Sequence, residues 1–366
     1  MRLCRKKERG VMKKRTGLGI CLLLCAALLL TGCRDAGLPS VSAPSVSHAS
    51  AVSAPNAMSE IPSDLSENES VPPDVPEPLF TFDPHLLSED AKRFLGDDLI
   101  PLYTRAVDSI LAHDGVVEDV ASEADFYRVW HVILFENYAL RAMIHNANTS
   151  ETPWIYTDGR VQMFFRMDAA ACEAHYRAFA EIINQALAQL REEDDDWART
   201  AKLYAFVSAH MAYGNVYDAY GIEATVYDAI VCGLGICGDY AVYLGLLLRH
   251  CGIPVMCGYS WGEDGLGGAD HMWTLACLDG SWYHFDACWQ AADELQRFGF
   301  FGMDDEERYQ SLSMNNFAGI AQNVSMFCMD WYTSARGALP ECPFGLSAAE
   351  REQMYAHVYG AYPLTE

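Results

Sequence analysis

The sequence has little positive charge beyond its first 32 residues. Eight of the 25 lysines and arginines lie in residues 1–32, together with one of the 50 acidic residues. The rest of the chain therefore holds 17 basic and 49 acidic residues, which is a formal charge of −32. Such a surface repels the phosphates of nucleic acids, and this argues against nucleic-acid binding. We interpret the acidic residues as a solvated surface.

The apolar stretch near the N-terminus, residues 18–30, is too short to span a bilayer comfortably. A basic segment precedes it and small residues follow it, so residues 1–32 are predicted to be an export signal. Residues 30–33 (LTGC) resemble the lipobox of bacterial lipoproteins. The resemblance implies cleavage before Cys33 and attachment of a diacylglyceryl group to its thiol, which would anchor the protein to the membrane. The alternative is an ordinary signal peptide with a chance cysteine.

Residues 33–78 are rich in Ser, Pro and Ala and have few large apolar side chains. A segment of this kind cannot bury enough apolar surface to offset the entropy lost on ordering, so we predict a disordered linker. The predicted protein is exported and stands on the extracytoplasmic face of the cell membrane, held through Cys33.

Residues 79–200 are predicted to form a mainly helical N-terminal segment. Asp158-Gly159, between two strand-like runs, predicts a β-hairpin, and Asp168 is predicted to cap a long helix. Apolar residues recur at helical spacing over residues 100–113, 125–139 and 197–210. The histidines of these elements have no partner at metal-ligand spacing, so we interpret them as structural: His131, His145, His175 and His210.

Cys237 stands at a glycine-rich entry to an apolar helix. Gly233 and Gly235 precede it, and apolar residues follow at helical spacing as far as a helix stop at Gly252. Cys237 is therefore predicted in the first helical turn, where unpaired backbone N–H groups and the positive end of the helix dipole favour a thiolate. A backbone N–H at this position is also suited to stabilising an oxyanion.

A second β-hairpin is predicted around Asp279-Gly280, a dipeptide typical of two-residue turns. The register that this turn sets places His271 and Asp286 on one face of the hairpin as diagonal neighbours. A slip of one residue would place them on opposite faces. The second strand is predicted to run as far as Trp289.

The segments GICGDYA and ADHMWTLACLDGSWYHFDACW resemble the transglutaminase-like superfamily of papain-type cysteine enzymes. The resemblance is strong over about residues 220–290, and FGFFGMDDEE, which ends at Glu307, gives weaker support. It implies an α+β fold with a papain/transglutaminase-like core over residues 201–366. In that core a helix that begins with the catalytic cysteine packs on an antiparallel sheet.

The same resemblance implies roles for three residues: Cys237 as the nucleophile, His271 as general base and acid, and Asp286 as the group that orients His271. This sequence departs from the family pattern at Cys288, where relatives usually have Thr, and at Asp239, where Gly is common. Neither departure removes a member of the triad.

The function that these residues imply is acyl transfer on peptide or protein amides through a thioester on Cys237. An amine would resolve the thioester in a transglutaminase, and water would resolve it in a cysteine peptidase or amidase. The sequence leaves these two outcomes open. We expect a peptide or protein substrate, for example one in the cell envelope, and no cofactor or metal.

Three alternatives stay open at this point. Cys237 is also compatible with a buried core cysteine in an inert transglutaminase-like module that binds peptides or the cell envelope. His284 shares a face with Asp286 and is a rival base. A zinc site is a third alternative, although its spacing matches no common motif, and its ligands would be a histidine with Cys232, Cys237, Cys251 and Cys257.

Replacement of Cys33 by Ala tests the predicted anchor. Without the thiol no diacylglyceryl group can be attached, so the variant should be released from the membrane or accumulate unprocessed. Cell fractionation measures this outcome. Cys25→Ala, which changes a cysteine of the apolar stretch outside the lipobox, is the control. A membrane fraction unchanged by Cys33→Ala would contradict the prediction.

Overall fold

The computed structural model describes residues 77–144, 152–215, 225–260, 271–292, 297–314 and 339–360. The predicted export signal, the lipobox cysteine Cys33 and nearly all of the predicted linker lie outside the described residues, as does His145. Within the described ranges, none of the helices is long and apolar enough to cross a membrane.

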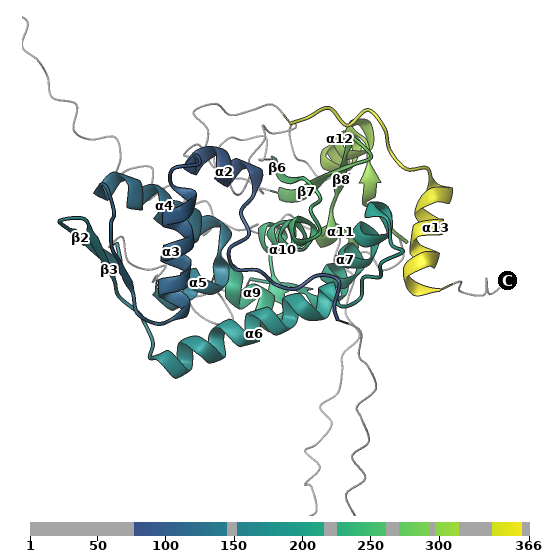
Figure 1. Ribbon diagram of the computed structural model, residues 1–366. Coiled ribbons are helices and arrows are strands. Elements are labelled where there is room, and N and C mark those ends of the chain that lie inside the picture. The colour runs from purple at the N-terminus through teal and green to yellow at the C-terminus, as the bar shows by residue number, and fades with distance from the viewer. Residues whose placement is uncertain are drawn as a thin grey trace, which may run out of the picture.

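The first half of the described chain packs helices against a small antiparallel sheet (Figure 1). Its elements are α2 (Glu89–Leu95), α3 (Ile100–Leu111), β1 (Val116–Val117), α4 (Glu123–Glu136), α5 (Tyr138–Ile144), β2 (Trp154–Thr157) and β3 (Arg160–Met163). The strand order is β1-β3-β2. Asp158 and Gly159 form the predicted hairpin turn, and both have positive φ, 47° and 86°, as a tight two-residue turn requires.

Two long helices follow, α6 (Ala169–Leu187) and α7 (Asp196–His210). The side chain of Asp168 caps α6, as predicted. The first turn of α6 buries Cys172 in the core of the first half, and a later turn buries Phe179 in the core of the second half. The helix therefore belongs to both cores.

The second half is built around α10 (Cys237–His250), in which every residue from 237 to 249 is buried. Its other elements are β4 (Ala212–Tyr213), α9 (Val226–Cys232), β5 (Leu234–Gly235), β6 (Val255–Ser260), β7 (His271–Leu278), β8 (Ser281–Phe285), α11 (Ala287–Ala292), β9 (Phe301–Met303), α12 (Asp305–Met314) and α13 (Ala348–Tyr359). The larger sheet has the antiparallel order β6-β7-β8-β9. Thr274 of β7 donates from Oγ1 to the backbone oxygen of Ala241 at 3.0 Å, which joins α10 to this sheet. The predicted α+β class, with a helix packed on an antiparallel sheet, is confirmed.

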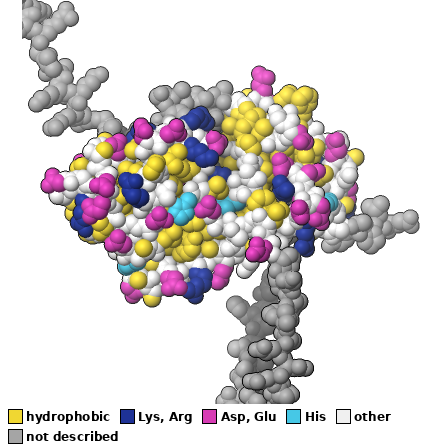
Figure 2. Space-filling model, viewed as in Figure 1, with side chains coloured by type: hydrophobic (Ala, Val, Ile, Leu, Met, Phe, Trp, Pro, Cys, Tyr) yellow, Lys and Arg dark blue, Asp and Glu magenta, His cyan; other side chains and the backbone are white. Residues whose placement is uncertain are grey.

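Acidic side chains are spread over the face of the molecule shown in Figure 2, where they outnumber lysine and arginine side chains. They lie among polar and hydrophobic groups and do not gather into one patch. This distribution agrees with the interpretation of the acidic residues as a solvated surface.

The prediction for the end of the second hairpin was wrong. β8 ends at Phe285, and residues 287–292 form α11, so the strand does not continue as far as Trp289. The cause is Asp286, whose Oδ1 accepts the backbone N–H of Trp289 at 3.0 Å. A carboxylate that binds the N–H three residues later is a helix cap, so the chain turns into a helix at Asp286.

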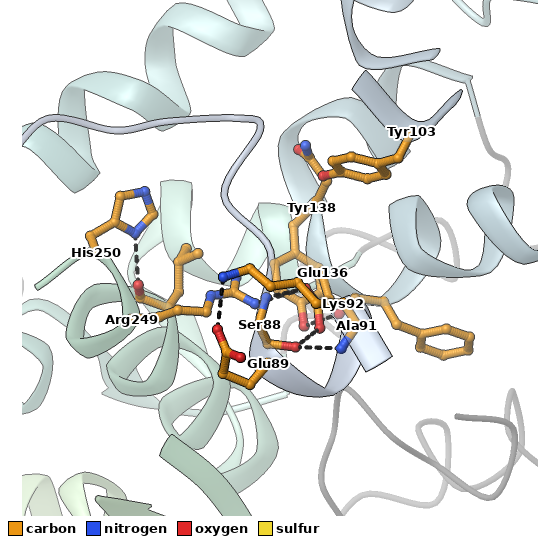
Figure 3. A network of polar contacts seen from close by, with 12 residues as sticks. Ser88, Glu89, Ala91, Lys92, Tyr103, Glu136, Tyr138, Arg249 and His250 are labelled. Carbon is orange, nitrogen blue, oxygen red and sulfur yellow. Dashed lines mark hydrogen bonds and ion pairs between the residues drawn. The ribbon is translucent and has the colours of Figure 1, made fainter. Parts of the chain in front are cut away.

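Glu136 of α4 and Arg249 of α10 form a buried ion pair between the two halves (Figure 3). Arg249 Nη1 lies 3.0 Å from Glu136 Oε2, and the two side chains are 7% and 0% exposed. The backbone N–H and the hydroxyl of Ser88 also donate to the Glu136 carboxylate. Burial raises the pKa of Glu136, and the charge of Arg249 opposes this rise. The pair attaches the last turn of α10 to the first half of the molecule.

Glu136→Gln removes one charge of this pair and leaves Arg249 buried without its counter-charge. We expect the free energy of unfolding to fall by about 3–5 kcal/mol, because an uncompensated buried charge is strongly unfavourable. Urea denaturation measures the loss. The double variant Glu136→Met with Arg249→Met removes both charges and should lose much less. Equal losses in the single and double variants would show that the buried charge is not the cause.

Candidate active site

Cys237 is the first residue of α10, as the sequence predicted. The preceding residue, Ile236, is extended, and its backbone N–H donates to Asp239 Oδ2 at 2.9 Å, which caps the helix. The approach to the helix is tight at Gly235, where an added Cβ would lie 2.9 Å from Asp239 Cβ. Only glycine fits there, so the glycine before the cysteine serves close packing. Cys237 itself is 5% exposed.

The hairpin of β7 and β8 has the predicted register, with Leu278 opposite Ser281. In this register His271 and Asp286 share a face, and His271 Nε2 donates to Asp286 Oδ2 at 2.6 Å. Both side chains are buried. Burial alone would raise the pKa of Asp286, but His271 and Arg308 outweigh it and hold that pKa below its usual value.

The N-terminal turn of α10 packs beside the first residues of β7. A Cβ added to Gly238 would lie 3.3 Å from Met272 Sδ. Cys237 precedes Gly238, and His271 precedes Met272, so each of the two residues is one position away from this contact. The structure thus brings the helix N-terminus that bears Cys237 to the end of the strand that bears His271.

Two tryptophans enclose the His271–Asp286 pair. The imidazole of His271 stacks on Trp289 with ring centroids 4.4 Å apart and planes at 16°. The ring of Trp273 lies 6.1 Å from the imidazole, with planes at 19°. These flat neighbours restrict rotation of the imidazole, so its hydrogen bond to Asp286 has a defined direction.

Arg308 is a site residue that the sequence reasoning missed. Its Nη1 donates to Asp286 Oδ2 at 2.9 Å, and both side chains are fully buried. The stretch that resembles the family ends at Glu307, one position before Arg308. An arginine in an acidic helical turn gives no local signal of burial. Only the position of α12 beside the sheet reveals its role.

His284, the rival base, belongs to a different hydrogen-bond network. Trp273 Nε1–H donates to His284 Nδ1 at 2.9 Å, so the ring proton of neutral His284 is on Nε2, which donates to Asp305 Oδ1 at 3.0 Å. Burial lowers the pKa of His284 and favours this neutral form. Both ring nitrogens of His284 are therefore bonded to groups other than Asp286, and His284 anchors Trp273.

The described residues contain one group with the geometry of metal ligands: His284, Asp305 and Cys342. This group does not fit a metal. The hydrogen bond from Trp273 to Nδ1 of His284 leaves the ring proton on Nε2, and Nε2 would have to lose this proton to bind a metal ion. Asp305 is also occupied, since its Oδ2 accepts the backbone N–H of Cys342 at 2.9 Å. The cysteines considered as zinc ligands, Cys232, Cys237, Cys251 and Cys257, form no such group within the described ranges.

A cysteine at a helix N-terminus, beside a His–Asp pair on an antiparallel sheet, is the architecture of the papain-type folds. Residues 183–287 match the family model of the transglutaminase-like superfamily. The chain therefore carries a transglutaminase-like domain, and the match includes Cys237, His271 and Asp286. No curated protein matches the chain.

Two solved structures are similar to parts of the chain. One is a protein from Cytophaga hutchinsonii described as a candidate cysteine protease, with 19% identity over 31% of this chain and 39% of that chain, and a TM-score of 0.25. The other is a TGase, with 10% identity over 42% of this chain and 46% of that chain, and a TM-score of 0.26. The chain covers less than half the length of either.

Asp239, two residues after Cys237, gives the site a testable pH dependence. Burial raises the pKa of Asp239 to about 7, and the hydrogen bond from Ile236 opposes this rise. Between its usual pKa of about 4 and about 7, the folded protein holds a proton that the unfolded chain releases. The contribution of Asp239 to stability is therefore complete at low pH and is lost as the pH rises through 7.

Asp239→Asn keeps an acceptor for the Ile236 N–H and cannot ionise. Its free energy of unfolding relative to wild type should therefore rise between pH 5 and pH 8, as urea denaturation at several pH values measures. Asp168→Asn, which changes the exposed cap of α6, is the control. A difference between Asp239→Asn and wild type that is constant over this range would contradict the prediction.

Proposed function

We propose that the protein is a cysteine acyl-transfer enzyme that acts on peptide or protein amides. The observation that carries this proposal is the buried 2.6 Å hydrogen bond between His271 and Asp286, beside the helix N-terminus that bears Cys237. Nucleophilic catalysis by a thiol needs a base that is oriented by a third group, and these residues supply that set.

In the proposed mechanism His271 takes the proton of the Cys237 thiol. Since Nε2 of His271 donates to Asp286, this proton moves to Nδ1. Asp286 stabilises the imidazolium that forms, and the N-terminus of α10 stabilises the thiolate.

The thiolate sulfur then forms a bond to the carbonyl carbon of the amide, and an electron pair moves to the carbonyl oxygen. His271 gives its proton to the amide nitrogen as the C–N bond breaks, so an amine leaves and a thioester stays on Cys237. An amine or water attacks the thioester and restores the thiol. Backbone N–H groups in the first turn of α10 are suited to stabilising the oxyanion.

The place of this reaction is part of the proposal. We propose that the chain is exported and anchored by a lipid on Cys33, and that the linker of residues 33–78 holds the folded part at the extracytoplasmic face of the membrane. The lipobox resemblance and the composition of the linker support this. The substrate would then be a peptide or protein within reach of the cell surface.

Alkylation by iodoacetamide tests the proposal. Cys237 should be labelled much faster than the other cysteines at neutral pH, because a thiolate is the reactive form. Mass spectrometry of peptides measures the rate at each cysteine. Cys237→Ala should abolish the fast reaction, whereas Cys232→Ala, which removes an exposed thiol, should leave it unchanged. Fast labelling that survives Cys237→Ala would favour the inert binding module instead.

The two fates of the thioester are separated by a second assay with the same proteins. A glutamine-containing peptide is incubated with and without a primary amine. Incorporation of the amine identifies a transglutaminase, and release of ammonia or a shorter peptide in the absence of the amine identifies a hydrolase. Cys237→Ala is the blank for both products.

A further inference from the structure

Arg308 is buried beside the proposed catalytic pair although its side chain is charged. Asp286 Oδ2 accepts from Arg308 Nη1 at 2.9 Å and from His271 Nε2 at 2.6 Å, so one oxygen serves both donors. The guanidinium carbon lies 4.3 Å from the ring centre of Trp273 and 4.4 Å from that of Trp289. Two indoles and one carboxylate thus surround the cation.

The position of Arg308 is fixed by the first turn of α12. Asp305 accepts from His284, and His284 in turn accepts from the indole of Trp273. Arg308 follows Asp305 by three residues and so leaves α12 on the same side. α12 is therefore linked to Trp273 in two ways: Asp305 through His284 by hydrogen bonds, and Arg308 by its guanidinium, which lies over the indole ring.

The arrangement matters because of the charges that the proposed reaction places in a buried site. An ionised Asp286 with only a neutral histidine as partner would be unfavourable there. Arg308 supplies the opposite charge. When the thiol proton of Cys237 moves to His271, Cys237 gains a negative charge and His271 gains a positive charge. Together with Asp286 and Arg308, these two residues then have no net charge. Without Arg308, the other three would have a net negative charge.

We propose that Arg308 is a positioning residue of this reaction: it holds Asp286 ionised and in place, so that Cys237 and His271 form their ion pair at lower pH than they would without it. The inference rests on the proposed function and adds a fourth residue to the Cys–His–Asp set. It acts through Asp286, and its side chain is fully buried.

The other titratable groups around this cluster come from every element packed against it. Burial raises the pKa of Tyr204 and of Tyr240 above the usual value, and burial lowers the pKa of His284, so these three are neutral near pH 7. Asp239 changes its charge in the same range as the proposed ion pair and needs a separate control. Within the part of the chain that the structure describes, these groups are Tyr204 of α7, Asp239 and Tyr240 of α10, His284 of β8, Cys288 of α11, and Asp304 and Asp305 beside Arg308.

The pH dependence of Cys237 alkylation in the whole protein tests this inference. Arg308→Met removes the charge and keeps much of the side-chain volume. The midpoint of the alkylation profile should rise by at least about one pH unit, because a nearby positive charge is lost. The rate below the wild-type midpoint should then fall about tenfold. Arg308→Lys keeps the charge and should leave the midpoint near that of the wild type.

A purely structural role would lower the rate by the same factor at every pH and leave the midpoint in place, and this result would overturn the inference. If Arg308→Met does not fold, Arg308→Gln takes its place, because it removes the charge and keeps an N–H donor for Asp286; an unchanged midpoint in that variant would overturn the inference. Arg351→Met is the matched control. It breaks a 3.0 Å hydrogen bond to Glu307, which lies in α12 as Arg308 does, and it should leave the midpoint unchanged. The comparison is repeated in an Asp239→Asn background.

Failure of this inference can be told apart from failure of the proposed function. A wild-type midpoint at the ordinary thiol value of about 8.5 would overturn both. A low wild-type midpoint that Arg308→Met leaves in place would overturn the role of Arg308 alone and leave the proposed function standing.

Discussion

The site depends on one carboxylate, that of Asp286. Its Oδ2 accepts from His271 and Arg308, and its Oδ1 accepts the backbone N–H of Trp289 and so begins α11. Its backbone oxygen accepts the hydroxyl of Tyr204. A fully buried charge is stable only when it is compensated in this way. The same contacts therefore stabilise the fold and orient the histidine.

The central helix is held near both of its ends, and this is what gives Cys237 a defined position. Near its C-terminus, Arg249 is paired with Glu136 of the first half of the molecule. Near its N-terminus, Asp239 caps the helix and Thr274 joins Ala241 to the sheet. The first half of the chain contributes no proposed catalytic residue. It acts on the site by fixing the far end of the helix that carries the cysteine.

The parts of this site that local backbone rules control could be predicted from the sequence. The Asp279-Gly280 turn set the register of β7 and β8, and that register alone placed His271 and Asp286 on one face. The glycines before Cys237 predicted the start of α10. In both cases a short-range backbone preference decides the geometry, so a single sequence carries the information.

The parts that were missed depend on contacts between distant segments. The cap formed by Asp286 changed the expected strand into α11, and an aspartate at a strand end gives equal support to either structure. Arg308 follows Asp286 by 22 residues, and its guanidinium is buried against Asp286, Trp273 and Trp289. His284 had the right face for a base, but its partners Trp273 and Asp305 assign it to another network.

The most direct test of the account is the ionisation state of Cys237 in the folded protein. The ultraviolet absorbance of the thiolate, taken as the difference between wild type and Cys237→Ala, is followed as a function of pH. We predict that this signal is already present well below the ordinary thiol pKa of about 8.5, because His271 and the N-terminus of α10 stabilise the thiolate. A signal that appears only near pH 8.5 would contradict it.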